Sequence, residues 1–356
     1  MSQLFTPTQL GSIELANRVV MAPMTRSRSD DQGVPTAMML DYYRQRASAG
    51  LIIAEGTYPS ENGKGYCRTP GIVNQQQIDA WAGITEAVHQ EGGKIVLQIM
   101  HCGRCSHADN KSETAETVAP SAISAAGEVF TETGMKPFSE PRALRSDEIP
   151  EVIEEYRQAT ENAYAAQFDG VELHGTSGYL PAQFLSPGSN QRDDKYGGSL
   201  ENRVRFFAEV LEVMSKVDGA DKVGLRVCPG FPFNDVKDPN PQESFEAMLA
   251  AIEPLGLAYL HLMRASPLDV YELGHNFFKG PLILNGGYKK SSATQAIEER
   301  GATAVAFATS YIANPDLVAR LGEDLPLSEV KQELLYTNTP EGYSDYSNYD
   351  YSNHQG

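Results

Sequence analysis

Cysteines, long apolar runs and an excess of positive charge are all scarce in this sequence. Four cysteines in 356 residues do not make the disulfide framework of a small secreted domain, so a reducing, cytoplasmic setting is expected. The longest apolar runs, such as 304–308, are far shorter than the ~18 residues that a membrane-spanning helix needs. No basic segment followed by an apolar stretch opens the sequence, so no secretory signal is expected.

The charge balance restricts the partners that the protein can have. Asp and Glu number 47 against 29 Lys and Arg, which gives a net charge of -18. Such a surface repels nucleic acids and anionic membranes, and we expect neither as a partner. The expected partner is a small-molecule substrate, bound by a monomer or a small homo-oligomer.

Eight short apolar runs alternate with longer segments of helical period. The runs are continuous hydrophobic stretches, which is typical of parallel strands that are covered on both faces. Strands are expected at 18–24, 51–56, 94–101, 170–175, 222–229, 257–263, 281–287 and 304–309. Helices are expected at 35–50, 74–92, 146–168, 199–217, 241–255, 291–300 and 314–321, with a weaker one within 268–278.

This alternation predicts an α/β fold, the (β/α)8 TIM barrel. A doubly wound sheet is the structural rival, but it predicts a glycine-rich loop after the first strand, and 21–26 contains no glycine. Because the chain exceeds the ~250 residues of a typical barrel, we expect one domain, 1–356, with an insertion at 102–145 that caps the barrel mouth. The tyrosine-rich tail 337–356 has no helical or strand period and is expected to be irregular.

Polar residues gather where the predicted strands end. In a TIM barrel these C-terminal ends meet at one mouth, where the chemistry is built. Since buried polar groups are costly, such a set favours a ligand site over structural hydrogen bonds alone. The set comprises Thr25, Arg26, Glu55, Gly56, Gln98, His101, Glu172, His174, Arg226, His261, Asn285, Gly286, Gly287, Thr309 and Ser310.

Several motifs carry a resemblance to a known family. HGTSGYL begins at His174, QFLSP at Gln183 and NQRDDKYGGSLENRVRF at Asn190, with APMT at Ala22 and YIANPDLVARL at Tyr311. In their order along the chain, these motifs resemble the Old Yellow Enzyme family, and most closely its bacterial branch that reduces N-ethylmaleimide, nitrate esters and cyclic enones. The resemblance implies FMN at the barrel mouth and NAD(P)H as the hydride source. The implied reaction is reduction of the C=C bond of an activated alkene: an enone, a maleimide or a nitro compound.

The resemblance also assigns residues to the cofactor. Thr25 resembles the residue whose hydroxyl binds the flavin carbonyl next to the reactive nitrogen. Gln98 can donate and accept at once, which suits the pyrimidine edge of the flavin, and Arg226 keeps its positive charge to stabilise the anionic reduced flavin. An ion pair with Glu172 is the structural alternative for Arg226. The other expected cofactor-binding residues are Pro23, Met24, Gly56, Gly286, Gly287, Ala308 and Thr309.

Three residues have expected catalytic roles. Tyr179 resembles the proton donor to the alkene, because a phenol is a neutral acid at pH 7. His174 resembles the first of two residues that hold the substrate oxygen, and Ser177 stands where the family has Asn or His. A hydroxyl is shorter than either side chain, so we expect weaker polarisation of the substrate or a bridging water. Tyr66, Met100 and Tyr343 (or Tyr346) are expected to line the substrate side.

A second departure from the family pattern concerns the FMN phosphate. The family ends its eighth strand with Gly-Arg, and this chain has Ala308 and Thr309 there. A bidentate charged contact is worth roughly 1.5–3 kcal/mol, so weaker FMN binding is expected. Lys289 or Lys290 is a candidate replacement. A redox-neutral isomerase that uses Tyr179 and His174 as acid and base, and a binding protein that has lost FMN, stay open as alternatives.

Cys102 and Cys105 form a Cys-x-x-Cys motif between His101 and His107. A redox pair and a zinc site are the two alternative interpretations. No second Cys-x-x-Cys accompanies it, so no metal site is expected. Glu55, which could be taken for an acid catalyst, is interpreted as part of a strand end that faces the flavin.

Overall fold

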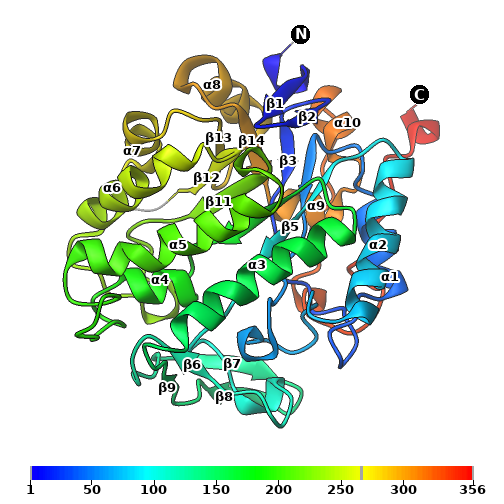
Figure 1. Ribbon diagram of the computed structural model, residues 1–356. Helices are drawn as coiled ribbons and strands as arrows, with labels where there is room; N and C mark the ends of the chain where they lie inside the picture. The colour runs from blue at the N-terminus through cyan, green and yellow to red at the C-terminus, as the bar shows by residue number, and fades with distance from the viewer. Residues whose placement is uncertain (1, 265–267, 355–356) are drawn as a thin grey trace.

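The computed structural model describes residues 2–264 and 268–354 and shows a closed barrel of eight parallel strands (Figure 1). Neighbouring strands follow the order β10-β11-β12-β13-β14-β3-β4-β5. Each predicted run contains one strand, so the predicted TIM barrel is confirmed. The strands are β3 (Val19–Met21), β4 (Leu51–Ile53), β5 (Ile95–Ile99), β10 (Gly170–His174), β11 (Val223–Val227), β12 (Tyr259–Met263), β13 (Leu282–Asn285) and β14 (Ala304–Phe307).

The expected helices also form, and two short ones, α4 and α9, were not predicted. Both have fewer than seven residues, too few to show a helical period in the sequence. Among the described residues, no helix combines the length and the apolar character that crossing a membrane requires. The helices are α1 (Ala37–Arg44), α2 (Gln75–Gln90), α3 (Ile149–Ala165), α4 (Leu180–Leu185), α5 (Leu200–Asp218), α6 (Pro241–Ile252), α7 (Val270–Phe277), α8 (Lys290–Arg300), α9 (Thr309–Ala313) and α10 (Leu317–Gly322).

Helix α2 shows how local sequence fixes an element of the outer layer. The Asn74 side chain accepts a hydrogen bond from the Gln77 backbone N–H, and the Gln77 side chain accepts one from the Asn74 backbone N–H, which makes a capping box. Trp81 is fully buried on the inner face of this helix, and its Nε1 donates to the Gly71 carbonyl at 3.1 Å. The helix is therefore both capped and anchored to the loop that follows β4.

The two ends of the barrel differ. The hairpin of β1 (Thr8–Leu10) and β2 (Ile13–Leu15) closes one end, where Leu10 and Ile13 pack with Val20 and Leu51 inside the barrel. At the opposite end lies the segment 102–145, with β6 (Val118–Ala119), β7 (Glu128–Thr131), β8 (Gly134–Pro137) and β9 (Arg142–Ala143) (Figure 1). The β7–β8 pair is an antiparallel hairpin. Of the two barrel ends, the mouth at the C-terminal ends of the strands is thus the one that is open to a ligand.

The tail is irregular over most of its length but firmly attached. Arg26 donates to the Gly342 carbonyl at 2.7 Å and Arg28 to the Leu335 carbonyl at 2.6 Å. Tyr343 is fully buried, and its ring stacks on Tyr42 with 4.1 Å between centroids. The expectation that Tyr343 lines the substrate side is therefore wrong, since its ring is enclosed by the helix layer.

Candidate active site

A cavity of about 510 Å³ opens at the barrel mouth. Strand ends β3 and β14 contribute Met24, Thr25, Ala308 and Thr309 to its wall. Tyr66 and Tyr179 line it from the loops after β4 and β10. The segment 102–145 adds Val129, Phe130 and Phe138, which make that side apolar. The structure thus brings six of the predicted site residues to one cavity.

Arg226 lies at the base of the mouth with its charge unpaired. Its Nη2 donates to Asn285 Oδ1 at 3.2 Å and to the Met263 sulfur at 3.3 Å, and its Nη1 donates to the Pro23 carbonyl at 3.4 Å, so all three acceptors are neutral. Its buried Nε has no hydrogen-bond partner among the described residues. Burial lowers the pKa of Arg226, and the charge of Glu172 opposes this shift only in part. Such a group fits an anionic ligand, and the ion pair with Glu172 is not formed.

Glu172 is instead the centre of a buried polar chain. Its two oxygens accept from Gln98 Nε2 at 2.8 Å and pair with His261 Nδ1 at 2.9 Å. Burial lowers the pKa of His261, so its imidazole is neutral near pH 7 and donates to the carboxylate. The contact with Glu172 fixes the Gln98 amide, which leaves its carbonyl oxygen as an acceptor for a ligand N–H.

His174 and Tyr179 stand together beside the mouth. Their rings meet edge to face, with 4.7 Å between centroids, and the Tyr179 hydroxyl lies 3.0 Å from that of Tyr66. Burial, with the charges of Arg226 and His261, lowers the pKa of His174 well below its usual value. Burial raises the pKa of Tyr179, so the phenol keeps its proton. The pair therefore offers a neutral imidazole, whose buried Nδ1 has no partner among the described residues, next to a neutral acid.

Ser177 faces a different space. It has a left-handed backbone (φ 59°), and its carbonyl accepts from Asn234 Nδ2 at 2.7 Å. The residue lines a neighbouring cavity of about 320 Å³ together with Gly175 and Thr176. The structure therefore places Ser177 at this neighbouring cavity and not in the wall of the mouth cavity that Tyr179 lines.

Met100 and Gly56 lie behind the mouth. Met100 is buried in a cluster with Tyr179, Cys102 and Cys105, so it supports the proton donor from behind rather than forming the wall of the mouth cavity. A Cβ at Gly56 would lie 2.5 Å from the Met100 sulfur, which explains the glycine there.

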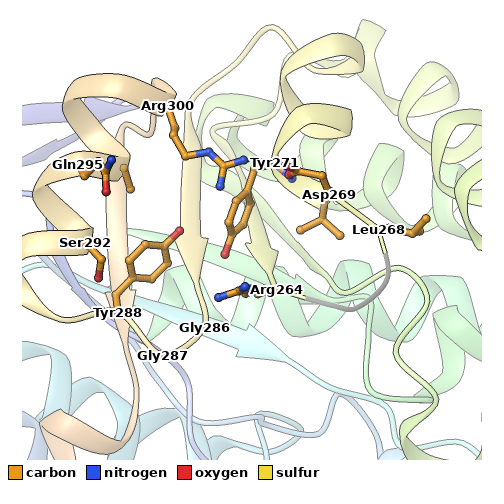
Figure 2. A pocket seen from close by; sticks show the side chains of 12 residues that line it. Arg264, Leu268, Asp269, Tyr271, Gly286, Gly287, Tyr288, Ser292, Gln295 and Arg300 are labelled. Carbon is orange, nitrogen blue, oxygen red and sulfur yellow. Dashed lines mark hydrogen bonds and ion pairs between the residues drawn. The ribbon is translucent and has the colours of Figure 1, made fainter.

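The remaining predicted cofactor residues, Gly286 and Gly287, line a separate groove of about 440 Å³ between α7 and α8 (Figure 2). Of the two candidate lysines, Lys290 pairs with Asp324 at 2.8 Å, and Lys289 is exposed. The walls of the groove come from other side chains, including Arg264 and Tyr288. Sequence reasoning missed Arg264, although an arginine directly after β12 satisfies the rule that strand ends carry the chemistry.

The Cys-x-x-Cys motif is enclosed by protein. Cys102 and Cys105 are buried free thiols, and burial raises the pKa of both, that of Cys105 to about 12. Thiols this far from ionising are poor nucleophiles and poor metal ligands. In the described part of the chain, no cluster of three or more His, Cys, Asp or Glu side chains is placed to hold a metal ion.

Glu55 also differs from its interpretation as a flavin-facing group. It is buried, with one oxygen accepting from the Arg26 backbone N–H at 3.2 Å and the other from the Tyr43 hydroxyl at 3.3 Å. Burial raises the pKa of Glu55 to about 7. The carboxyl therefore joins the first strand end to the helix layer below the mouth.

The barrel, the mouth cavity and the buried arginine fit a flavin-dependent oxidoreductase. Residues 3–328 match the family described as NADH:flavin oxidoreductase / NADH oxidase, and the chain belongs to this family. This membership confirms the Old Yellow Enzyme resemblance and the NAD(P)H-dependent flavin chemistry predicted from the sequence.

Individual relatives agree over nearly the whole chain. The chain is 39% identical over 352 residues to the "Probable flavin mononucleotide-dependent alkene reductase" of Leishmania infantum, covering 96% of each protein. It is similar to the solved structure of morphinone reductase in complex with tetrahydroNAD, at 43% identity and a TM-score of 0.94, with 98% of each chain covered. The Old Yellow Enzyme homologue from Zymomonas mobilis matches at 38% identity and a TM-score of 0.94, covering 97% of this chain and 99% of that one. These similarities support FMN-dependent alkene reduction over the redox-neutral and flavin-free alternatives.

Proposed function

We propose that the mouth cavity reduces the C=C bond of an activated alkene (an enone, a maleimide or a nitro compound), with Tyr179 as the proton donor. The observation that carries this proposal is the contact between the neutral His174 imidazole and the neutral phenol of Tyr179, which lines a cavity of about 510 Å³. Relatives are named for reducing morphinone and 12-oxophytodienoate, which supports an alkene activated by a neighbouring oxygen group.

FMN fits the polar groups at the mouth. Thr25, Gln98 and Arg226 would hold the flavin ring, with Pro23 and Met24 beside it. The chemistry that FMN supplies when bound is transfer of a hydride from NAD(P)H to one alkene carbon. Arg226 contributes the positive charge that hydride uptake by the ring requires, and its unpartnered Nε is free for that contact.

The protein's own side chains complete the reaction. His174, being neutral, donates one N–H to the substrate oxygen and so draws electron density from the double bond. Tyr179 gives its proton to the second alkene carbon, and the Tyr66 hydroxyl at 3.0 Å stabilises the phenolate that remains. The product then carries one added hydride and one added proton.

The apolar residues of segment 102–145 complete the substrate side. Val129 and Phe138 are buried at the mouth, and Phe130 is partly exposed above it. We infer that residues 1–356 act as one barrel domain in which this segment caps the mouth and excludes water from the reacting alkene. Cytoplasmic localisation and a monomeric or small homo-oligomeric state stay predictions.

Two half-reactions separate the roles. In the Tyr179→Phe variant, reoxidation of the reduced flavin by 2-cyclohexenone should slow about 10²–10⁴-fold, because the proton donor is lost. Bleaching of the flavin by NADPH should keep its rate, since no proton from Tyr179 enters that step. Tyr66→Phe is the matched control, which keeps the Tyr179 proton and should slow reoxidation less. Equal losses in both half-reactions would contradict the assignment of Tyr179.

A further inference from the structure

The groove between α7 and α8 contains a cation without a counter-ion. Arg264 follows β12 directly, and its backbone N–H donates to the Asn285 carbonyl at 2.9 Å, which holds it beside the end of β13. Its side chain is exposed to the groove, and no carboxylate of the described residues lies within 4.0 Å of its guanidinium. Figure 2 shows the side chain of Arg264 below Tyr271 and beside the Gly286–Gly287 turn.

The other charges of the groove are already committed. Asp269 is the carboxylate among the lining residues, and it pairs with Arg300 at 2.8 Å. Its second oxygen caps α7 by accepting from the Tyr271 backbone N–H at 3.1 Å. Arg264 is therefore the lining group whose charge is available to an incoming anion.

The adjacent turn leaves room for a ligand oxygen. Gly286 and Gly287 have positive φ angles of 135° and 71°, which favour glycine. A Cβ at Gly287 would meet no heavy atom within 4 Å, so the backbone is open there. A Cβ at Gly286 would lie 2.7 Å from Cβ of Arg264, so the glycine is what allows the arginine to lie against the turn.

FMN carries a phosphate dianion, and neither the end of β14 nor Arg26 offers it a free positive charge. Ala308 and Thr309 at the end of β14 carry no charge. Arg26 lines the mouth cavity, but its three guanidinium nitrogens donate to the Leu335 carbonyl, the Tyr42 hydroxyl and the Gly342 carbonyl. In the barrel, β13 lies between β12 and β14, so Arg264 and Thr309 flank the same Gly286–Gly287 turn from opposite sides.

We infer that Arg264 binds the FMN phosphate at the Gly286–Gly287 turn, from the β12 side. The planar guanidinium donates two parallel N–H bonds to phosphate oxygens, a geometry that a lysine does not match. Tyr288, whose ring also lines the groove, adds a hydroxyl donor on the same side. This inference rests on FMN being the cofactor, and it assigns a ligand residue that the sequence pattern places elsewhere.

Comparison of FMN with riboflavin isolates the phosphate. In apoprotein titrated by quenching of flavin fluorescence, Arg264→Met should weaken FMN binding about 10- to 100-fold and leave riboflavin binding unchanged. Arg300→Met is the matched control, because that arginine lines the same groove and is held by Asp269. It should change neither affinity, and Arg264→Lys should recover part of the loss.

Three outcomes would overturn the inference. Unchanged FMN binding in Arg264→Met would place the phosphate elsewhere, and equal losses for FMN and riboflavin would indicate a structural effect of the substitution. A wild-type protein that binds riboflavin as tightly as FMN would have no phosphate site. By contrast, wild-type apoprotein that binds neither flavin would contradict the cofactor itself and the proposed function with it. Thermal unfolding of each apoprotein confirms that the variants fold.

Discussion

The mouth of the barrel and the groove between α7 and α8 differ in how firmly their polar side chains are held. At the mouth, Gln98, Glu172 and His261 are at most 2% exposed, and each is fixed by a neighbour within 2.9 Å. In the groove, Arg264 is exposed, and no hydrogen bond or ion pair with the described residues fixes its side chain. Chemistry at the flavin ring needs atoms in set positions, whereas binding a phosphate needs a charge within reach. An arginine at a different strand end can therefore bind the phosphate without loss of the reaction at the flavin ring.

The largest expected effect is at the mouth. Arg226→Met should slow bleaching of bound flavin by NADPH about 10²–10³-fold, because negative charge on the ring then forms without its counter-charge. It should also weaken FMN and riboflavin binding alike, since Arg226 would hold the flavin ring, which both molecules share. Arg264→Met, measured at saturating FMN, should keep the wild-type bleaching rate. If Arg264→Met slowed bleaching as much as Arg226→Met, ring chemistry at the mouth and phosphate binding in the groove would not be separate functions.

The burial of Glu55 below the mouth should make the free energy of unfolding depend on pH. Because the folded pKa of Glu55 is about 7 and its ordinary value is 4.5, folding favours the protonated form. This contribution is complete below pH 4.5 and is lost as pH rises through 7. In urea unfolding, Glu55→Gln should gain up to about 3 kcal/mol relative to wild type between pH 5 and pH 8. Glu329→Gln, at an exposed position, should show no such trend, and a parallel trend in both variants would contradict the burial argument.

A smaller effect is expected when the positive charge is placed at position 309, on the other side of the Gly286–Gly287 turn. Thr309→Arg in the Arg264→Met background should recover FMN affinity about tenfold, with no change for riboflavin. Thr309→Lys in the same background is the control for charge alone and should recover less. Failure of both substitutions to help FMN would mean that the two strand ends do not share one phosphate site.

The sequence was sufficient for the barrel because each strand is a continuous apolar run and each long helix has its own period. Helices α4 and α9 were not predicted, because five or six residues are too few to show a helical period. At the site, Thr25, His174 and Tyr179 were predicted from the family motifs, and Gln98 and Arg226 from the resemblance and their places at strand ends. The structure gathers them at or beneath one mouth. Here motif and strand end coincide, so position in sequence was enough.

The positions of three other residues depend on loop conformation and tertiary packing, which the sequence pattern does not contain. Ser177 was assigned by its spacing from His174, but its left-handed backbone turns it to a neighbouring cavity. Tyr343 was expected to line the substrate side, but buried arginines bind the carbonyls of the tail and hold it against the helix layer. Arg264 was not considered, since its closeness to Gly286 depends on how β12 and β13 pair. Spacing along the chain contains none of these three facts.

The most direct test of the account is an anaerobic stopped-flow experiment on the wild-type protein reconstituted with FMN. Absorbance near the flavin maximum should fall on mixing with NADPH or NADH, and it should return on a second mixing with 2-cyclohexenone, N-ethylmaleimide or a nitroalkene. A flavin that neither nucleotide reduces, or a reduced flavin that none of the three alkenes reoxidises, would contradict the assignment of this site as an alkene reductase.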